Sequence, residues 1–325
     1  MPAFTATAPG KIILFGEHAV VYGEPAIAAP VQSLEARVIV NPDITGSPGE
    51  VQIEAQDIGL AAELNQLEPD HPLRAAIAAV VSEEKFKDLP ACQIQITSTI
   101  PISSGLGSSA AISAALIRAF SAFLGQRMTN EQVSQAAFEV EKIHHGTPSG
   151  IDNSVVAFQQ PIYYQKGVPL EFLSISSPFS ILIADSGSPG DTRKAVMAVK
   201  EGWVKDPDKY QGLFSEIGSI SARAREAISR GEINQLGPLM DRNHKLLQEL
   251  GVSTPKLDHL AQTAREAGAL GAKLSGGGLG GHLIALVNDQ VETPWERLLE
   301  AGAASVFLSA ISGPFQSESG GPEGQ

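Results

Sequence analysis

Two glycine-rich stretches, each joined directly to an apolar element, constrain the fold of this chain more than any other feature. The first, PISSGLGSSAAISAALIRAF, spans residues 101–120 and changes from serine and glycine into an apolar helical pattern. Its glycines permit positive φ and close backbone approach, and a helix starting near Ser109 would offer unpaired N–H groups and a positive dipole end. Such a loop can cradle an anion, although a flexible turn before a buried helix would have a similar composition.

The second stretch strengthens this interpretation. GAKLSGGGLGGHLIALV, at residues 271–287, has five glycines between Gly276 and Gly281 immediately before an apolar strand pattern, more than a simple hairpin requires. The first stretch lacks both the Gly-Lys-Ser/Thr ending of the P-loop and the G-x-G-x-x-G dinucleotide pattern. Two such loops in different halves of the chain therefore predict a ligand held between them by a less common phosphate-binding arrangement.

Length, composition and charge limit the class of protein. At 325 residues, with 43% hydrophobic and 18% charged residues, the chain can form one large domain or about two ordinary ones. A formal net charge of −13 argues against nucleic acid or an anionic membrane surface as a partner. There is no signal-peptide pattern, no apolar run near the ~20 residues that span a bilayer, and a single cysteine, Cys92. These features predict a soluble cytoplasmic protein without internal disulfides.

Residue periodicity predicts both strands and helices, and therefore an α+β fold. Strands are expected at FTATA, KIILFGE, ARVIVN, VQIEA, QIQITSTI, GHLIALVND and ASVFLSAI. Helices are expected within residues 71–84, 108–125, 129–146, 191–203, 209–231, 233–250 and 253–268. We expect an N-terminal domain over residues 1–170, a C-terminal domain over 171–312 and a disordered polar tail over 313–325.

Several helix starts carry capping signals. Thr129 and Gln132 form a capping box for a helix that closes on Gly146. Asp191 and Ser253 are expected as N-caps of two later helices. These signals fix the starts of the predicted helices more closely than periodicity alone.

Charged residues at the ends of a predicted strand form the first set of candidate site residues. Lys11 begins the apolar run KIILF, and Glu17 and His18 follow it. Burial of such groups is costly unless each meets a partner, so they indicate function rather than core packing. The alternative is an exposed strand edge with solvated charges.

Two carboxylates form a second set. Glu141 lies in the last turns of the capped helix, and Asp152 follows the turn TPSG and precedes SVVAF, which resembles a strand. A carboxylate on such a turn beside a phosphate site could hold Mg²⁺ or accept a proton from an alcohol. Taken alone, an aspartate in a surface turn is the commoner case.

These segments together resemble a known superfamily. PGKIILFGEHAVVYGEPAIAAPV, PISSGLGSSAA and KLSGGGLGGHLIAL look like the three motifs of the GHMP kinases, in the same order. FGEHAVVYG, HHGTPSGIDN and LLQELGVSTPKLDHL are similar to the mevalonate kinase family within it. The resemblance covers about residues 9–287 and implies a two-domain GHMP kinase fold with the active site in the interdomain cleft. It also implies ATP-dependent phosphorylation of the C5 hydroxyl of mevalonate, an early step of isoprenoid biosynthesis.

The resemblance implies a role for each matching residue. Asp152 is implied as the base facing the C5 hydroxyl, with Lys11 as the cation beside it. The implied mevalonate contacts are Glu17, His18 and Thr192. The implied ATP-phosphate contacts are Pro101, Ser103, Ser104, Gly105, Leu106, Gly107, Ser108, Ser109, Gly276, Gly277 and Gly278. Ser109 and Glu141 would reach Mg²⁺, and a homodimer would fit the family.

Two residues depart from the family pattern, and the sequence leaves several alternative functions open. Ser103 and Leu279 stand where relatives more often have glycine, which leaves the conformation of both loops open. Another GHMP kinase, acting on phosphomevalonate, galactose or homoserine, is the main alternative, followed by a diphosphomevalonate decarboxylase or a non-catalytic sensor. Few extra cations are available for a phosphorylated substrate, mainly Arg193, Lys194 and Lys273. No sugar-kinase signature is present at the N-terminus, and a sensor would not need the full set of candidate catalytic groups.

Overall fold

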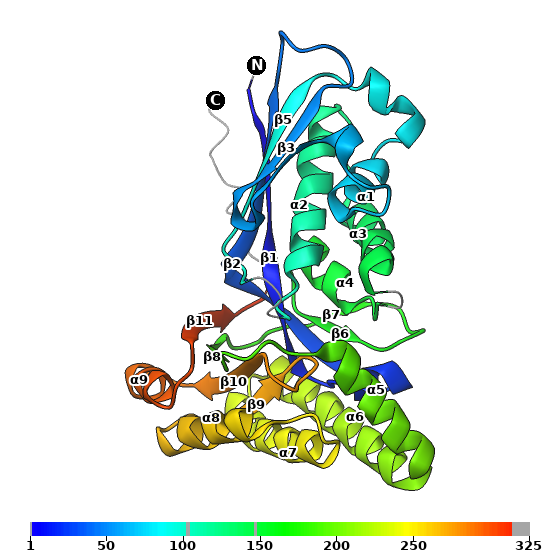
Figure 1. Cartoon of the computed structure of the whole chain (residues 1–325). Coiled ribbons are helices and arrows are strands. Elements are labelled where there is room, and N and C mark those ends of the chain that lie inside the picture. Colours follow the sequence, from blue (N-terminus) through cyan, green and yellow to red (C-terminus); the bar gives the residue numbers. More distant parts are fainter. Residues whose placement is uncertain (1, 102–104, 146–147, 314–325) are drawn as a thin grey trace, which may run out of the picture.

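Strands and helices are mixed along the whole chain, which confirms the α+β class (Figure 1). The computed structural model describes residues 2–101, 105–145 and 148–313. Within these residues the strands form one seven-stranded and one four-stranded sheet. Each sheet is built largely from one half of the sequence.

The first sheet has the strand order β4-β3-β5-β2-β6-β7, and β1 pairs with β2 outside this path. All of its pairs are antiparallel except β3 with β5. Its strands are β1 (Phe4–Phe15), β2 (Ala26–Pro42), β3 (Val51–Ala55), β4 (Leu60–Glu63), β5 (Cys92–Ser98), β6 (Ile162–Tyr164) and β7 (Glu171–Phe172). FTATA and KIILF, expected as separate runs, thus belong to the single strand β1, whose register against β2 shifts between Pro9 and Gly10.

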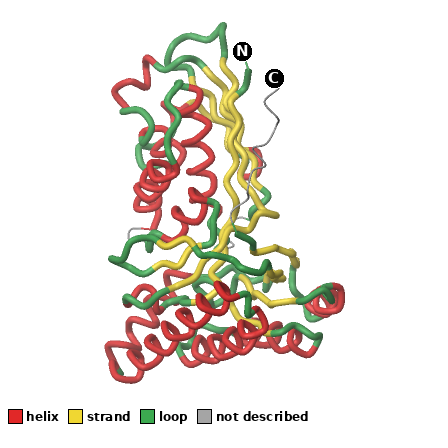
Figure 2. Tube along the Cα trace, turned by 180° about the vertical axis from the view of Figure 1, so that it is seen from behind, coloured by secondary structure: helices red, strands yellow, loops and turns green. Residues whose placement is uncertain are grey.

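Helices of the first half pack together on one face of this sheet (Figures 1 and 2). They are α1 (Pro72–Ala78), α2 (Ser108–Phe123), α3 (Asn130–His145) and α4 (Ile151–Phe158). α2 packs against β1 and β2, and its buried face is rich in alanine and serine. Small side chains let the helix approach the sheet closely, which brings its first turn next to β1.

The second sheet has the order β11-β8-β10-β9 and is antiparallel throughout. Its strands are β8 (Phe179–Asp185), β9 (Gly271–Ser275), β10 (His282–Val287) and β11 (Ser305–Ile311). The helices of this half are α5 (Thr192–Lys205), α6 (Pro207–Arg230), α7 (Leu236–Glu249), α8 (Pro255–Glu266) and α9 (Glu292–Glu300). α7 and α8 pack against β9, so the strand that precedes the second glycine-rich loop is fully buried.

Two local predictions were wrong. SVVAF is part of α4 rather than a strand, because its apolar residues bury one side of a short helix that packs on α2 and α3. The N-cap of α8 is Thr254, not Ser253: the Thr254 hydroxyl accepts the N–H of Leu257. The extended backbone of Thr254 before Pro255 explains this choice, since the residue before proline disfavours helical geometry.

Other capping predictions are confirmed. The Gln132 side chain accepts the N–H of Thr129 at 2.9 Å, and the Thr129 hydroxyl accepts the N–H of Gln132 at 3.3 Å. Asp191 caps α5 through the N–H of Lys194 at 2.8 Å. The expected helix end at Gly146 and almost all of the predicted tail lie outside the described residues.

One contiguous apolar core runs through both sheets. It includes Phe15 of β1 and Phe214 of α6, both fully buried. The Ser275 hydroxyl of β9 also donates to the carbonyl of Ile13 at 2.7 Å, which ties the two sheets together directly.

No helix among the described residues is both long and apolar enough to cross a membrane. The division at residue 170 stays a prediction.

Candidate active site

The first glycine-rich loop contacts Lys11 just after a register shift in β1. The shift lies between Pro9 and Gly10, and the N–H of Lys11 donates to the carbonyl of Leu106 at 2.8 Å. Gly107 has φ 75°, and a Cβ there would lie 2.7 Å from Lys11 Cγ. The left-handed backbone and the lack of space together explain why glycine occupies this position.

Lys11 and Asp152 form an ion pair at this point. Lys11 Nζ lies 3.0 Å from Asp152 Oδ1, with side chains 9% and 34% exposed respectively. Asp152 belongs to the first turn of α4, which begins after Gly150 in a left-handed conformation. The structure therefore joins two residues 141 positions apart, as the resemblance implies; their chemical roles remain a prediction.

A second polar pair lies at the start of α2. The Ser109 hydroxyl donates to Glu141 Oε1 of α3 at 2.7 Å, and Glu141 is almost completely buried. Pro101 and Ser108 belong to the same loop and helix start. The N-cap of α2 is Gly107, which has no side chain to cap the first N–H groups, so these groups can serve an anion. The predicted phosphate contacts Ser103 and Ser104 lie outside the described residues.

The loop between β1 and β2 reaches into the second half of the chain. The Glu17 carboxylate pairs with the ammonium group of Lys273 in β9, and both side chains are essentially inaccessible to solvent. His18 Nε2 donates to the carbonyl of Gly277 at 2.8 Å. Glu17 and His18 are therefore held by β9 and by the second glycine-rich loop.

Burial is the largest influence on the pKa values of Glu17, His18 and Lys273. It raises the pKa of the Glu17 carboxyl and lowers the pKa of the Lys273 ammonium, while the contact between them opposes both changes. Burial also lowers the pKa of His18, and its bond to the Gly277 carbonyl opposes that change. His18 is therefore a neutral imidazole with its proton on Nε2, and its φ of 60° is uncommon for a residue other than glycine.

Aromatic stacking fixes the rest of this loop. Tyr22, at the end of the short 3₁₀ helix η1 (Ala19–Tyr22), stacks on Phe214 of α6 with ring centroids 4.0 Å apart. Its edge also meets Trp203 of α5 at 5.3 Å. The residues that follow β1 are thus embedded in the helices of the second half.

The second glycine-rich loop packs tightly against α5 and the segment before α8. A Cβ on Gly277 would lie 2.3 Å from Thr192 Oγ1, and one on Gly278 would lie 2.2 Å from the carbonyl of Val252. Leu279 donates its N–H to the same carbonyl at 2.8 Å and has φ 55°. Leu279, which departs from the family pattern, therefore occupies a backbone conformation that glycine would adopt more easily.

The sequence interpretation missed the role of Lys273. It named this residue only as a spare cation, whereas the structure places it at the centre of the contact between Glu17 and β9. A signal was present, since Lys273 interrupts the apolar run before the glycines, as Lys11 begins one. The argument from buried charge applies equally to both lysines.

Comparison with known proteins decides the family. The family model "GHMP kinases N terminal domain" matches residues 72–160, and "GHMP kinases C terminal" matches residues 224–304. Mevalonate kinase of Thermococcus sibiricus is 38% identical over 303 residues, covering 88% of this chain and 89% of the relative. The chain belongs to the mevalonate kinase family.

Other members of the family agree. The mevalonate kinase of Thermococcus gammatolerans is 39% identical, with the same shares of both chains covered. The crystal structure of L. major mevalonate kinase in complex with R-mevalonate matches with a TM-score of 0.80 at 28% identity, covering 96% of each chain. The mevalonate kinase fold therefore extends over nearly the whole of this chain.

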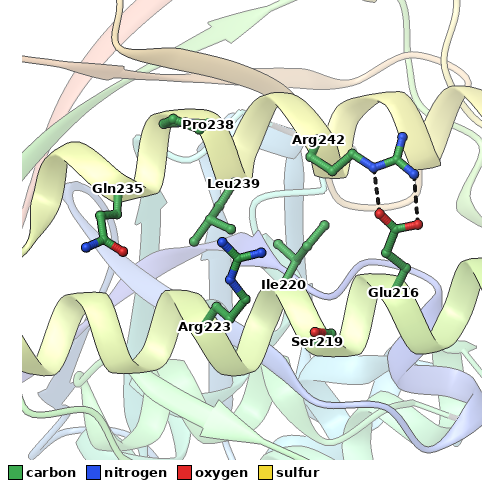
Figure 3. Close-up of a pocket in the computed structure, with 8 residues that line it drawn as sticks. All are labelled: Glu216, Ser219, Ile220, Arg223, Gln235, Pro238, Leu239 and Arg242. Carbon is green, nitrogen blue, oxygen red and sulfur yellow. Dashed lines mark hydrogen bonds and ion pairs between the residues drawn. The ribbon is translucent and has the colours of Figure 1, made fainter.

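This family member also has a surface pocket away from the predicted site. It has a volume of about 330 Å³ and lies between α6 and the 235–242 segment (Figure 3). On its wall, Arg242 pairs with Glu216 through bonds of 2.6 and 2.8 Å. None of the predicted site residues lines it. We therefore assign the phosphoryl transfer implied by the family to the region around Lys11 and Asp152, not to this pocket.

Proposed function

We propose that this chain transfers the γ-phosphoryl group of ATP to the C5 hydroxyl of mevalonate, giving 5-phosphomevalonate and ADP. The observation that carries the proposal is the Lys11–Asp152 ion pair, at 3.0 Å, beside the glycine-rich start of α2. Phosphoryl transfer depends chiefly on positioning and on neutralising negative charge. An anion cradle adjoining a lysine and a carboxylate meets both needs.

Each member of the ion pair has a distinct role in this reaction. Asp152 orients the hydroxyl of mevalonate and accepts its proton as the oxygen bonds to the γ-phosphorus. Lys11 stays close to the transferring group and offsets its negative charge. The N–H groups at the start of α2, within residues 105–109, and the loop at 276–278 bind the phosphates of ATP.

Ser109 and Glu141 fit a magnesium site. They present a hydroxyl and a carboxylate oxygen 2.7 Å apart, and oxygen ligands of this kind suit Mg²⁺, which commonly also binds substrate phosphates and water. When bound, Mg²⁺ would neutralise charge on the phosphate groups. The near-complete burial of Glu141 keeps its carboxylate in a fixed position for this purpose.

Mevalonate would lie between the two halves of the chain. Glu17 and His18 come from the first half and Thr192 from the second, and Gly277 contacts the last two residues. We further propose that the domains divide near residue 170 and that the protein is cytoplasmic, which suits an acidic chain with one buried cysteine. We also propose a homodimer, as the resemblance to the family implies.

The substrate assignment is tested by an ADP-release assay in which mevalonate, phosphomevalonate, galactose and homoserine are offered separately. We expect turnover with mevalonate and at most traces with the other three. Turnover with phosphomevalonate alone would overturn the substrate assignment while leaving the family assignment intact.

The role of Asp152 is tested by the variants Asp152→Asn and Asp152→Ala. We expect kcat to fall by about 10²- to 10⁴-fold, the range for a positioned base, while ATP still binds in a fluorescence or calorimetric titration. Asp208→Asn is the matched control, because Asp208 also lies in the first turn of a helix, α6, but is exposed. Near-normal turnover of Asp152→Asn would refute the assigned role.

A further inference from the structure

Lys273 is a completely buried lysine to which the proposed reaction assigns no role. Its side chain is 0% exposed, and within the described part of the chain its ammonium group binds the Glu17 carboxylate and, at 2.7 Å, the carbonyl of Leu274. Burying an ammonium ion in a strand is costly, and one ion pair with one carbonyl bond offsets that cost only partly. Packing alone would favour an apolar residue in the middle of β9.

The two oxygens of the partner carboxylate differ in their contacts. Glu17 Oε1 receives Lys273, whereas Glu17 Oε2 is buried and has no hydrogen-bond partner among the described residues. A buried, charged oxygen without a donor is destabilising, and such groups in native proteins call for an explanation. A hydroxyl group of a ligand would supply the missing donor.

We propose that Lys273 is a positioning residue: it fixes the Glu17 carboxylate across the boundary between the two halves, so that Glu17 Oε2 accepts a hydrogen bond from a substrate hydroxyl. This inference rests on the proposed function, because it takes a hydroxyl-bearing substrate to lie beside Glu17. Lys273 itself touches neither reactant. Its effect on the reaction passes entirely through Glu17.

The surrounding charges favour this role. Without a cation, burial would drive Glu17 toward its neutral form, since burial raises the pKa of this carboxyl. Lys273 is the largest opposing influence on this pKa, followed by the backbone N–H of Glu17 itself and by the charge of Lys11. His18 is neutral at neutral pH because its pKa is lowered by burial. His244 of α7, next to Lys273, is also neutral, with a pKa of about 4. Lys273 is therefore the group that most favours the ionised form of Glu17.

The experiment compares Lys273→Met with the control Lys245→Met, which alters an exposed lysine of α7. We expect Lys273→Met to lower kcat/KM for mevalonate by at least about 10²-fold at pH 7, with KM for ATP changed by less than about threefold. We also expect the acidic limb of its pH profile to move upward by about one to three pH units, the usual effect of losing an adjacent opposite charge. Activity should therefore partly return at high pH.

A second variant separates positioning from simple structural support. In Glu17→Gln with Lys273→Met, no buried charge is left unpaired, so Tm should recover relative to Lys273→Met alone. Activity should stay low and independent of pH across the range where Lys273→Met recovers. A merely structural lysine would instead give activity that follows Tm in both variants.

Failure of this inference about Lys273 can be distinguished from failure of the proposed function. If the wild-type protein does not phosphorylate mevalonate, the function is wrong and the catalytic part of this inference is overturned with it. If the wild-type protein is active and Lys273→Met keeps its kcat/KM and pH profile, the inference alone is overturned. The same result follows if activity in the two variants tracks Tm.

Discussion

His244 should make the stability of this protein fall on mild acidification. The residue lies in α7 and is 2% exposed, and its Nδ1 accepts the N–H of Leu274 at 3.2 Å. Its Nε2 lies 3.1 Å from Asp258 Oδ1. Burial lowers the pKa of His244 from 6.5 to about 4, aided by the charges of Arg265 and Lys273, while Asp258 opposes the change. The folded protein thus holds this imidazole neutral.

The size of this loss of stability follows from the linkage between proton binding and folding. Below pH 6.5 the unfolded chain binds a proton at residue 244 that the folded protein does not bind, so stability is lost as pH falls from 6.5 toward 4. One pH unit of difference in pKa corresponds to 1.36 kcal/mol. His244 alone should therefore cost about 2 kcal/mol of unfolding free energy between pH 7 and 5, and about 3 kcal/mol by pH 4.

The assay is urea unfolding of wild type and His244→Asn at pH 7, 6, 5 and 4. Asparagine cannot titrate, but its oxygen can still accept the N–H of Leu274, so the variant should lose less stability than wild type by the amounts above. Other groups that titrate in this range, including buried His18, cancel in the comparison. His259→Asn, at an exposed position of α8, is the control. Parallel pH dependence in wild type and His244→Asn would refute the reasoning.

Two further predictions concern the site itself. Gly107→Ala should lower kcat/KM by about tenfold or more by pushing a Cβ against Lys11, whereas Gly125→Ala, with the same left-handed strain but open space, should cost only about 1 kcal/mol of stability. Equal activity losses in both would assign the effect to backbone strain. Glu141→Gln should raise the Mg²⁺ concentration for half-maximal activity by about 10- to 100-fold, and the exposed Glu139→Gln should not. An unchanged Mg²⁺ titration in Glu141→Gln argues against the metal site.

Local features of the fold were predictable because they depend on neighbouring residues. The capping box at Thr129 and the start of α2 within one residue of Ser109 rest on short-range hydrogen bonds and periodicity. SVVAF was misassigned for the same reason: its β-branched residues favour a strand locally, but packing against α2 and α3 makes it a helix. Tertiary contacts outweigh local preference in so short a segment.

The contacts within the candidate site were less predictable from the sequence than the local features of the fold. Lys11 and Asp152 could be paired only through the resemblance to a family, since nothing in the spacing of 141 residues fixes their distance. The pairing of Glu17 with Lys273 was not predicted, because it depends on how one end of β1 meets β9 across the sheet boundary. The argument from buried charge singled out Lys11 and Glu17 but not their partners, and it was not applied to Lys273.

The embedding of the β1–β2 loop in the second half has a consequence for biosynthesis. Glu17 and its partner are 256 residues apart, so at ~5–20 residues per second a nascent chain exposes Glu17 for roughly 13 to 50 s before Lys273 is even synthesised. During that time the first sheet can form on the ribosome, but the end of β1 has no counter-ion. The contact between Glu17 and Lys273 therefore forms long after the residues of the Lys11–Asp152 pair have been synthesised, and a chain truncated before β9 would leave Glu17 without its cation.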